Sequence, residues 1–223
     1  MKQLIFAAEV GVGSRSLPGM LAVPQNARGL IIFAHGSGSS RLSPRNAHAA
    51  GVLQRRGFAT LLFDLLTPDE AADRRNVFDI DLLARRVIEA VDWARADARI
   101  RSMAIGLFGA STGAGAALAA AAARPSEVAA VVSRGGRPDL AGAALERVRS
   151  PTLLIVGGDD TDVIALNRAA QTKLRCESKL AVVPGAGHLF EEPGTLDQAL
   201  AAASHWFEAH IIKGGGDQHA AVS

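Results

Sequence analysis

The chain has 223 residues, 48% of them hydrophobic, and its 24 lysines and arginines nearly balance 22 aspartates and glutamates. This length and composition suit one globular domain with a large apolar core. A near-neutral chain without a block of lysines and arginines gives no charge signal for nucleic-acid binding.

Composition also bears on the compartment and on cofactors. The single cysteine, Cys176, has no partner for a disulfide within the chain, and the first residues lack the apolar core of a signal peptide. No apolar run is long enough to cross a bilayer. His205 and His210 are five residues apart, which is the wrong spacing for two metal ligands on one helix face. We therefore expect a cytoplasmic protein that binds no membrane, no metal and no cofactor.

The first half of the chain alternates strands with helices. Its strands have alternating or continuous apolar residues, and they are expected at 4–10, 17–23, 29–34 and 58–63. The first two are joined by a Gly/Ser turn and form a hairpin. The helices have apolar residues at helical spacing, and they are expected at 46–56 and 78–96.

The alternation continues to the end of the domain. A short apolar stretch ends near Phe108 and is followed by a turn and an alanine-rich helix. Further strands are expected at 128–133, 152–156 and 179–183, and further helices at 140–147, 163–174 and 196–212. This order predicts an α/β fold with a mainly parallel sheet, helices on both faces and the hairpin at one edge. Residues 1–212 form the predicted domain, and the glycine-rich residues 213–223 are predicted to be a disordered tail.

The turn before the alanine-rich helix has the sequence Gly109-Ala110-Ser111-Thr112-Gly113. A serine at such a sharp turn from strand to helix presents its hydroxyl above the sheet. Flanking glycines are needed there because helix and strand pass closely. The pentapeptide alone is common by chance, so a mechanism also requires a base, an acid and an oxyanion hole.

The base and the acid are expected in loops that follow two later strands. Ligands of an open parallel sheet bind beyond the carboxyl ends of its strands. His188 follows the last predicted strand, and Asp160 follows the strand before it, with Asp159 and Asp162 as neighbours. The chain order serine, aspartate, histidine is that of α/β-hydrolases. One of the three aspartates is expected to cap the following helix instead.

The chain resembles the α/β-hydrolase superfamily and, within it, the small dienelactone hydrolase-like branch that has no lid domain. The resemblance spans roughly 17–212 and rests on the sequences at 35–38 (HGSG), 109–113 (GASTG), 157–163 (GGDDTDV) and 185–188 (GAGH). It implies that Asp160 is the acid and that the reaction is hydrolysis of an ester or related acyl bond. Dienelactone hydrolase itself has a cysteine nucleophile where this chain has Ser111, so its substrate is not implied.

An oxyanion hole needs two preorganised donors. The backbone N–H of Thr112, at the start of the helix, is the first candidate. The second is expected in the glycine-rich loop after His35, where Ser37 is preferred and Gly36 is the alternative.

Arginines near these loops predict a site for an anionic group. Arg134 and Arg137 follow a predicted strand, whereas Arg41 and Arg45 lie near the oxyanion loop. A guanidinium group binds carboxylate or phosphate in a bidentate manner. Arg134 and Arg41 are therefore candidate substrate ligands, with simple surface solvation as the alternative left open. Phe190, next to His188, is a candidate pocket wall.

The predicted function is that of a serine esterase, which cleaves a small ester, thioester or lactone and favours an anionic substrate. Ser111, His188 and Asp160 form the predicted catalytic triad. Between the strands at 128–133 and 152–156 there is room for only one short helix, so no lid is expected. Two alternatives stay open: a hydrolase fold that binds without turnover, and a phosphate- or nucleotide-binding protein. The second lacks a complete phosphate-binding glycine motif. Whether the chain forms a homodimer is also open.

Overall fold

The computed structural model describes residues 5–212. Its centre is an eight-stranded sheet with the order β1-β2-β4-β3-β5-β6-β7-β8. The strands are β1 (Ile5–Val12), β2 (Leu17–Pro24), β3 (Leu30–Ala34), β4 (Ala59–Phe63), β5 (Ile105–Ala110), β6 (Val128–Arg134), β7 (Thr152–Gly157) and β8 (Ser178–Val183). The hairpin β1–β2 pairs antiparallel with itself and with β4, and β3 to β8 are parallel. The predicted mainly parallel sheet with an antiparallel hairpin at one edge is confirmed.

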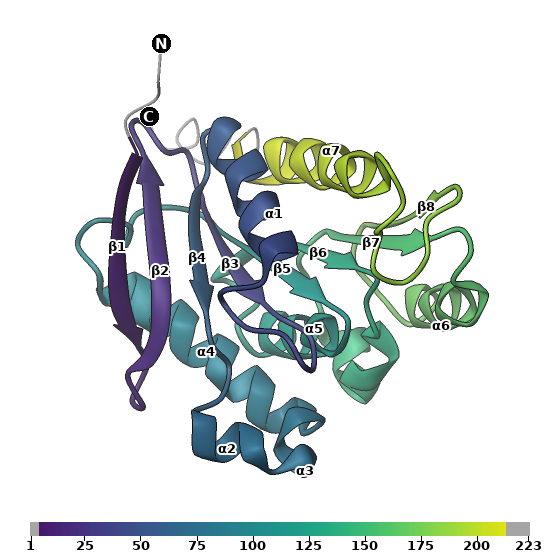
Figure 1. The fold of residues 1–223 in the computed structure, drawn as a ribbon, viewed down its shortest axis with the longest axis horizontal. Coiled ribbons are helices and arrows are strands. Elements are labelled where there is room, and N and C mark those ends of the chain that lie inside the picture. The colour runs from purple at the N-terminus through teal and green to yellow at the C-terminus, as the bar shows by residue number, and fades with distance from the viewer. Residues whose placement is uncertain (1–4, 213–223) are drawn as a thin grey trace, which may run out of the picture.

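Helices cover both faces of this sheet, as predicted (Figure 1). One face carries α1 (Pro44–Arg55) and α7 (Thr195–Phe207), and the π-helical turn η2 (Glu208–Ile212) follows α7 directly in the chain. The other face carries α4 (Ile80–Ala96), α5 (Thr112–Ala123) and α6 (Thr161–Gln171), together with the 3-10 segment η1 (Pro138–Arg147). The predicted tail at 213–223 lies outside the described residues.

The core is divided into two layers by the sheet, because successive strand residues point to opposite faces. In β3, Ile31 and Phe33 pack in the layer under α1 and α7. Leu30 and Ile32 pack in the layer under α4 and α5. All five residues of β3 are buried, which is why the central strands have no polar alternation. The sheet is therefore a fixed platform, and its carboxyl edge holds the loops that follow each strand.

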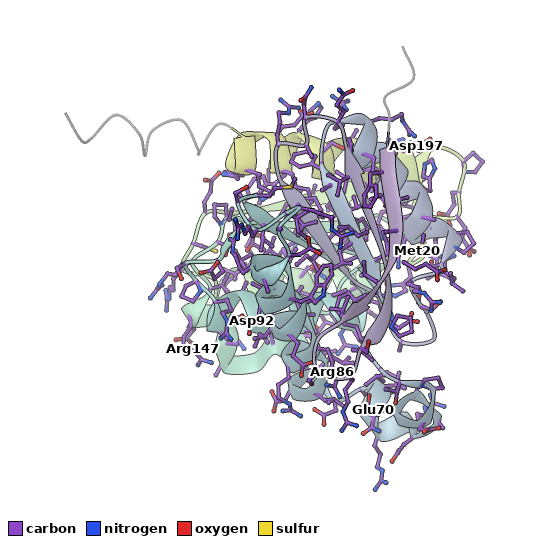
Figure 2. The ribbon with its side chains drawn as sticks, turned by 90° about the vertical axis from the view of Figure 1, so that its left-hand side faces the viewer. Met20, Glu70, Arg86, Asp92, Arg147 and Asp197 are labelled. Atoms are coloured by element: carbon purple, nitrogen blue, oxygen red, sulfur yellow. The ribbon has the colours of Figure 1, made fainter. Side chains whose placement is uncertain are left out.

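Two short helices between β4 and α4 were not predicted, namely α2 (Pro68–Ala72) and α3 (Arg74–Val77). A signal for α2 exists in the sequence: Thr67 and Glu70 form a capping box, in which each side chain accepts from the other residue's backbone N–H. Neither helix buries a residue, so the apolar pattern that predicts longer helices is missing. Glu70 Oε1 lies 2.8 Å from Arg86 Nη2 of α4, and Figure 2 shows these two side chains meeting where α2 approaches α4. This pair fixes α2 to the body of the domain.

Segment η1 also differs from the regular helix predicted at 140–147. Gly142 has φ 54° and ψ −128° inside it, so two short 3-10 turns meet at a kink. It is nevertheless the one short helical segment expected between β6 and β7. Within residues 5–212, no helix combines the length and the apolar character that a membrane span requires.

Candidate active site

Ser111 occupies the turn between β5 and α5. Its backbone has φ 50° and ψ −125°, a conformation that costs a non-glycine residue on the order of 1–3 kcal/mol. Gly113 permits this turn, because a Cβ there would overlap the carbonyl oxygens of Ala34 and His35 on the neighbouring strand. The strain and the tight packing place Ser111 beyond the carboxyl edge of the sheet, as the GASTG sequence predicts.

His188 and Asp160 meet at the same edge. His188 follows β8 and Asp160 follows β7, and these two strands pair directly. Asp160 Oδ2 lies 2.6 Å from His188 Nδ1. The Asp160 side chain is 15% exposed and the His188 side chain is 39% exposed. This pairing leaves Nε2 as the imidazole nitrogen that can exchange a proton with another group.

The structure distinguishes the three neighbouring aspartates. Asp160 is the residue that precedes α6, yet its side chain makes no capping hydrogen bond there, because the carboxylate faces His188. Among the hydrogen bonds of residues 5–212, neither Asp159 nor Asp162 contacts the imidazole. The carboxylate that the family resemblance selects is therefore the one that the fold brings to His188.

Ser111 and His188 line one cavity of about 220 Å³. Gly36 lines the same cavity and lies so close to the serine that a Cβ at Gly36 would be 2.8 Å from Ser111 Cβ. Across residues 5–212 no hydrogen bond joins the Ser111 hydroxyl to the imidazole. Such bonds often tighten only when substrate is present.

The two predicted oxyanion donors differ in their surroundings. Thr112 is the first residue of α5, and the first amides of a helix have no partner within the helix. The Ser37 N–H donates to the hydroxyl of Thr112, with 2.9 Å between the two heavy atoms. Ser37 therefore remains a predicted donor. To bind an oxyanion, its N–H must either leave the Thr112 hydroxyl or donate to the hydroxyl and the oxyanion together.

The four arginines expected near the site are placed in two different ways. Three of them have a carboxylate partner: Arg41 pairs with Asp64, Arg45 pairs with Glu191 at 3.0 Å, and Arg137 pairs with Asp139 at 2.8 Å. Asp64 thus neutralises the charge of Arg41, and Arg41 does not line the cavity that Ser111 lines. Arg134 is the exception, because within the described part of the chain no carboxylate lies within ion-pair distance of it.

Arg134 is a buried cation that borders the cavity of Ser111 and His188. The residue is 8% exposed, and its Nε and Nη1 atoms have no hydrogen-bond partner among residues 5–212. Its Cζ lies 6.0 Å from the ring centroids of both Phe108 and Phe190. Burial, with a smaller contribution from the nearby charge of Arg45, lowers the pKa of Arg134 to about 10. The group is still charged at neutral pH.

Phe190 has a different position from the pocket wall that the sequence suggests. It is 3% exposed and adopts a left-handed backbone with φ 56°, and its ring covers Arg134. The cavity wall beside His188 is instead formed by Leu189, which is 44% exposed. The sequence signal for Leu189 was only its position next to His188.

Asn167 is a supporting residue that the sequence did not indicate. It is fully buried on α6, and its Nδ2 donates to the carbonyl oxygen of Gly136 at 2.9 Å. This bond fixes the loop that follows Arg134. A buried asparagine on an amphipathic helix was the available signal, since buried polar side chains require partners.

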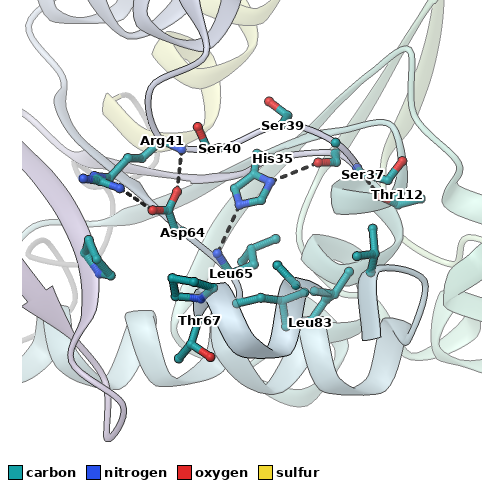
Figure 3. Close-up of a pocket in the computed structure, with 17 residues that line it drawn as sticks. His35, Ser37, Ser39, Ser40, Arg41, Asp64, Leu65, Thr67, Leu83 and Thr112 are labelled. Atoms are coloured by element: carbon teal, nitrogen blue, oxygen red, sulfur yellow. Dashed lines mark hydrogen bonds and ion pairs between the residues drawn. The ribbon is translucent and has the colours of Figure 1, made fainter. Parts of the chain in front are cut away.

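His35 braces the loop that carries Ser37. Its Nε2 accepts the backbone N–H of Leu65 at 3.1 Å, and its Nδ1 lies 3.0 Å from the carbonyl oxygen of Gly36 (Figure 3). These contacts assign the neutral ring with the proton on Nδ1. Burial is the main reason that the pKa of His35 falls below its ordinary value. His35 therefore joins the loop to the segment after β4 and has no free nitrogen for proton transfer.

Known proteins share both the sequence and the fold of this chain. The sequence pattern of the dienelactone hydrolase family matches residues 17–211. A crystal structure of dienelactone hydrolase from Anabaena variabilis is similar at a TM-score of 0.90 and 51% identity, over 95% of this chain and 100% of that chain. Est1E from Butyrivibrio proteoclasticus has the same fold, with a TM-score of 0.74 at 15% identity, over 92% of this chain and 98% of Est1E.

A relative from Mycobacterium tuberculosis, named a putative phosphoribosyl transferase, is 56% identical over 207 residues, which are 93% of this chain and 47% of the relative. The chain thus spans about half the length of this curated relative. The family match and the Anabaena structure both cover nearly the whole chain described above. The chain belongs to the dienelactone hydrolase family of α/β-hydrolases.

Proposed function

We propose that the protein is a serine hydrolase that cleaves a small ester, thioester or lactone through an acyl-enzyme on Ser111. The observation that carries the proposal is the 2.6 Å contact of Asp160 with His188, since His188 lines one cavity together with the strained Ser111. Membership of a hydrolase family supports the reaction class. The proposal concerns this chain alone and not the longer mycobacterial relative.

The reaction follows from the positions of the three side chains. His188 Nε2 removes the proton from Ser111 as its Oγ bonds to the acyl carbon, and Asp160 stabilises the imidazolium that results. When the tetrahedral intermediate collapses, the imidazolium protonates the leaving oxygen or sulfur. His188 next takes a proton from water, which attacks the acyl carbon and releases the acid. The proton then returns to Ser111 Oγ.

A substrate with an anionic group is favoured by Arg134. A buried cation without a counterion is unfavourable, and a substrate carboxylate in the same cavity would compensate it. Arg41, the other candidate from the sequence, already has Asp64 as its partner. The proposed anion ligand is therefore Arg134, because Arg45, which lines the same cavity, already has Glu191 as its partner.

Substitution of the nucleophile tests the reaction. A fluorophosphonate probe should label the wild type on Ser111, and Ser111→Ala should lose both the label and the turnover of 4-nitrophenyl acetate. The control is Ser126→Ala, because Ser126 is exposed in the turn before β6, at the opposite edge of the sheet. Turnover that survives in Ser111→Ala would refute the mechanism.

A matched pair of esters tests the anionic preference. 4-Acetoxybenzoate and its methyl ester differ in charge but share the scissile bond. Arg134→Ala should lower the kcat/KM ratio of the anionic to the neutral ester by at least about tenfold, since a charged hydrogen bond contributes roughly 1.5–3 kcal/mol. Arg137→Ala removes an arginine that is paired with Asp139 and should change this ratio less than twofold. An unchanged ratio in Arg134→Ala would remove the anion site from the proposal.

The two alternatives predict other results. A binding module without turnover would hydrolyse none of these esters and would leave Ser111 unlabelled. The name of the mycobacterial relative suggests a phosphoribosyl donor, although this chain matches only 47% of that protein. A rise in Tm with phosphoribosyl diphosphate, in the absence of any ester hydrolysis, would favour the alternative of a phosphate- or nucleotide-binding protein.

A further inference from the structure

A second cavity of about 350 Å³ lies beside the oxyanion loop, and it is separate from the cavity of Ser111 and His188. Its floor and far wall come from the segment after β4, from α2 and α3, and from the start of α4 (Figure 3). The apolar side chains that line it are Pro18, Leu65, Leu66, Pro68, Ala71, Val77 and Leu83. We refer to it as the Leu65 cavity.

Several polar side chains in the wall of the Leu65 cavity already have hydrogen-bond or ion-pair partners in the protein. The Asp64 carboxylate accepts the Arg41 backbone N–H at 2.7 Å and also pairs with the Arg41 guanidinium. The Thr67 hydroxyl accepts the backbone N–H of Glu70 at 3.2 Å. Both ring nitrogens of His35 are engaged as described above. Because these groups have their partners already, the cavity offers a ligand mainly apolar contact.

The Leu65 cavity adjoins the reaction centre through consecutive residues. Ser111 lines the first cavity and Thr112 lines the second. Gly36, Ser37 and Ser39 line both, so the oxyanion loop lies between the two cavities. An acyl group on Ser111 therefore lies beside the loop that both cavities share.

The position of His188 decides which part of a substrate faces this cavity. His188 must protonate the leaving group, so that group lies on the side of His188 and Arg134, in the first cavity. The carbonyl oxygen points to the oxyanion amides, so the acyl chain takes the remaining direction, away from His188 and past the loop that both cavities share. We infer that the Leu65 cavity is the acyl subsite, and that it selects an apolar alkyl or aryl acyl group. This inference rests on the proposed hydrolase function.

The far wall of the cavity is firm enough to give a size limit. Its helix α2 begins with a capping box at Thr67, and Glu70 ties it to Arg86, whose side chain is 7% exposed. Asn76 Nδ2 of α3 donates to the Glu70 carbonyl oxygen at 2.9 Å. A bulky side chain in place of Ala71 would project into the cavity without disturbing these bonds.

A chain-length series tests the inference. For 4-nitrophenyl esters from acetate to octanoate, wild-type kcat/KM should rise up to about fourfold per added methylene until the cavity is full, since burial of a CH₂ contributes about 0.8 kcal/mol. Ala71→Trp should lower the octanoate-to-acetate ratio of kcat/KM at least tenfold. Ala72→Trp, on the same helix but not in the cavity wall, should change that ratio less than twofold. A ratio that is the same in Ala71→Trp and wild type would overturn the inference.

Two further measurements test the Leu65 cavity independently of Ala71→Trp folding and of turnover. Val77→Phe fills the cavity from α3 and should repeat the effect if Ala71→Trp does not fold. Calorimetric titration of Ser111→Ala with 2-octanone, which has no scissile bond, reports on the cavity without turnover. Binding that Ala71→Trp abolishes would show that the Leu65 cavity takes an apolar ligand, whereas the absence of ester hydrolysis by the wild type would refute the proposed function. Absence of 2-octanone binding overturns the subsite.

Discussion

Replacement of Arg134 by methionine is expected to make the protein more stable while weakening its preference for anionic substrates. Arg134 is 8% exposed, has no carboxylate partner among the described residues, and leaves Nε and Nη1 without hydrogen-bond partners there. Methionine fills a similar volume with a flexible apolar chain. The substitution therefore removes a buried charge without opening a large cavity.

The magnitude follows from the pKa of this arginine. Burial lowers it to about 10, well below its ordinary value, and because each pKa unit corresponds to about 1.36 kcal/mol the buried charge costs roughly 3 kcal/mol. The loss of the contacts with the Phe108 and Phe190 rings offsets about 0.5–1 kcal/mol for each ring. We expect the free energy of unfolding to increase by about 1–2 kcal/mol, which raises Tm by roughly 2–8 °C in a domain of this size.

The assay is urea unfolding of wild type, Arg134→Met and Arg137→Met at neutral pH, with calorimetry for Tm. Arg137→Met should be neutral or slightly destabilising, because Arg137 is paired with Asp139 in a partly exposed position. The unfolded chain holds its arginine proton to higher pH than the folded chain. The advantage of Arg134→Met should therefore be complete below about pH 10 and shrink above it. A loss of more than about 1 kcal/mol in Arg134→Met would refute the reasoning, since it would mean that the cation is stabilised by its surroundings.

Three further changes test the rest of the site. Asp160→Asn should lower kcat by a factor on the order of 10⁴, because the amide favours the wrong tautomer of His188. The free energy of unfolding should change by less than about 1 kcal/mol. A kcat near the wild-type value would contradict the proposed role of Asp160. Gly113→Ala should destabilise by at least about 3 kcal/mol or prevent folding, because its Cβ would overlap two backbone oxygens, and urea unfolding measures this. Burial lowers the pKa of His35, so the unfolded chain binds the proton first and wild-type stability falls as pH drops below about 6.5. The stability difference between wild type and His35→Gln should narrow over that range, and a constant difference from pH 7.5 to 5 would argue against a buried neutral ring.

The sequence was sufficient for those parts of the fold that depend on local pattern. Continuous apolar strands, alternating with amphipathic helices, predict a parallel sheet covered on both faces, and the chain order of Ser111, Asp160 and His188 predicts the hydrolase arrangement. Helices α2 and α3 were missed because they bury no residue, so they leave no apolar period. They form the far wall of the Leu65 cavity, which for the same reason was not foreseen.

The sequence by itself determined which chemical groups follow which strand, because the apolar pattern and the glycines indicate where each strand ends and each loop begins along the chain. Only the tertiary structure decided how the charged groups are shared among partners. The sequence does not distinguish the four arginines, yet Arg41, Arg45 and Arg137 each have a carboxylate partner. Arg134 lines the cavity of Ser111 and has no such partner among residues 5–212. Charge pairing depends on which side chains meet from distant segments, and local sequence does not contain that information. The same reason explains why the Ser37 amide, predicted as an oxyanion donor, has the Thr112 hydroxyl as its acceptor.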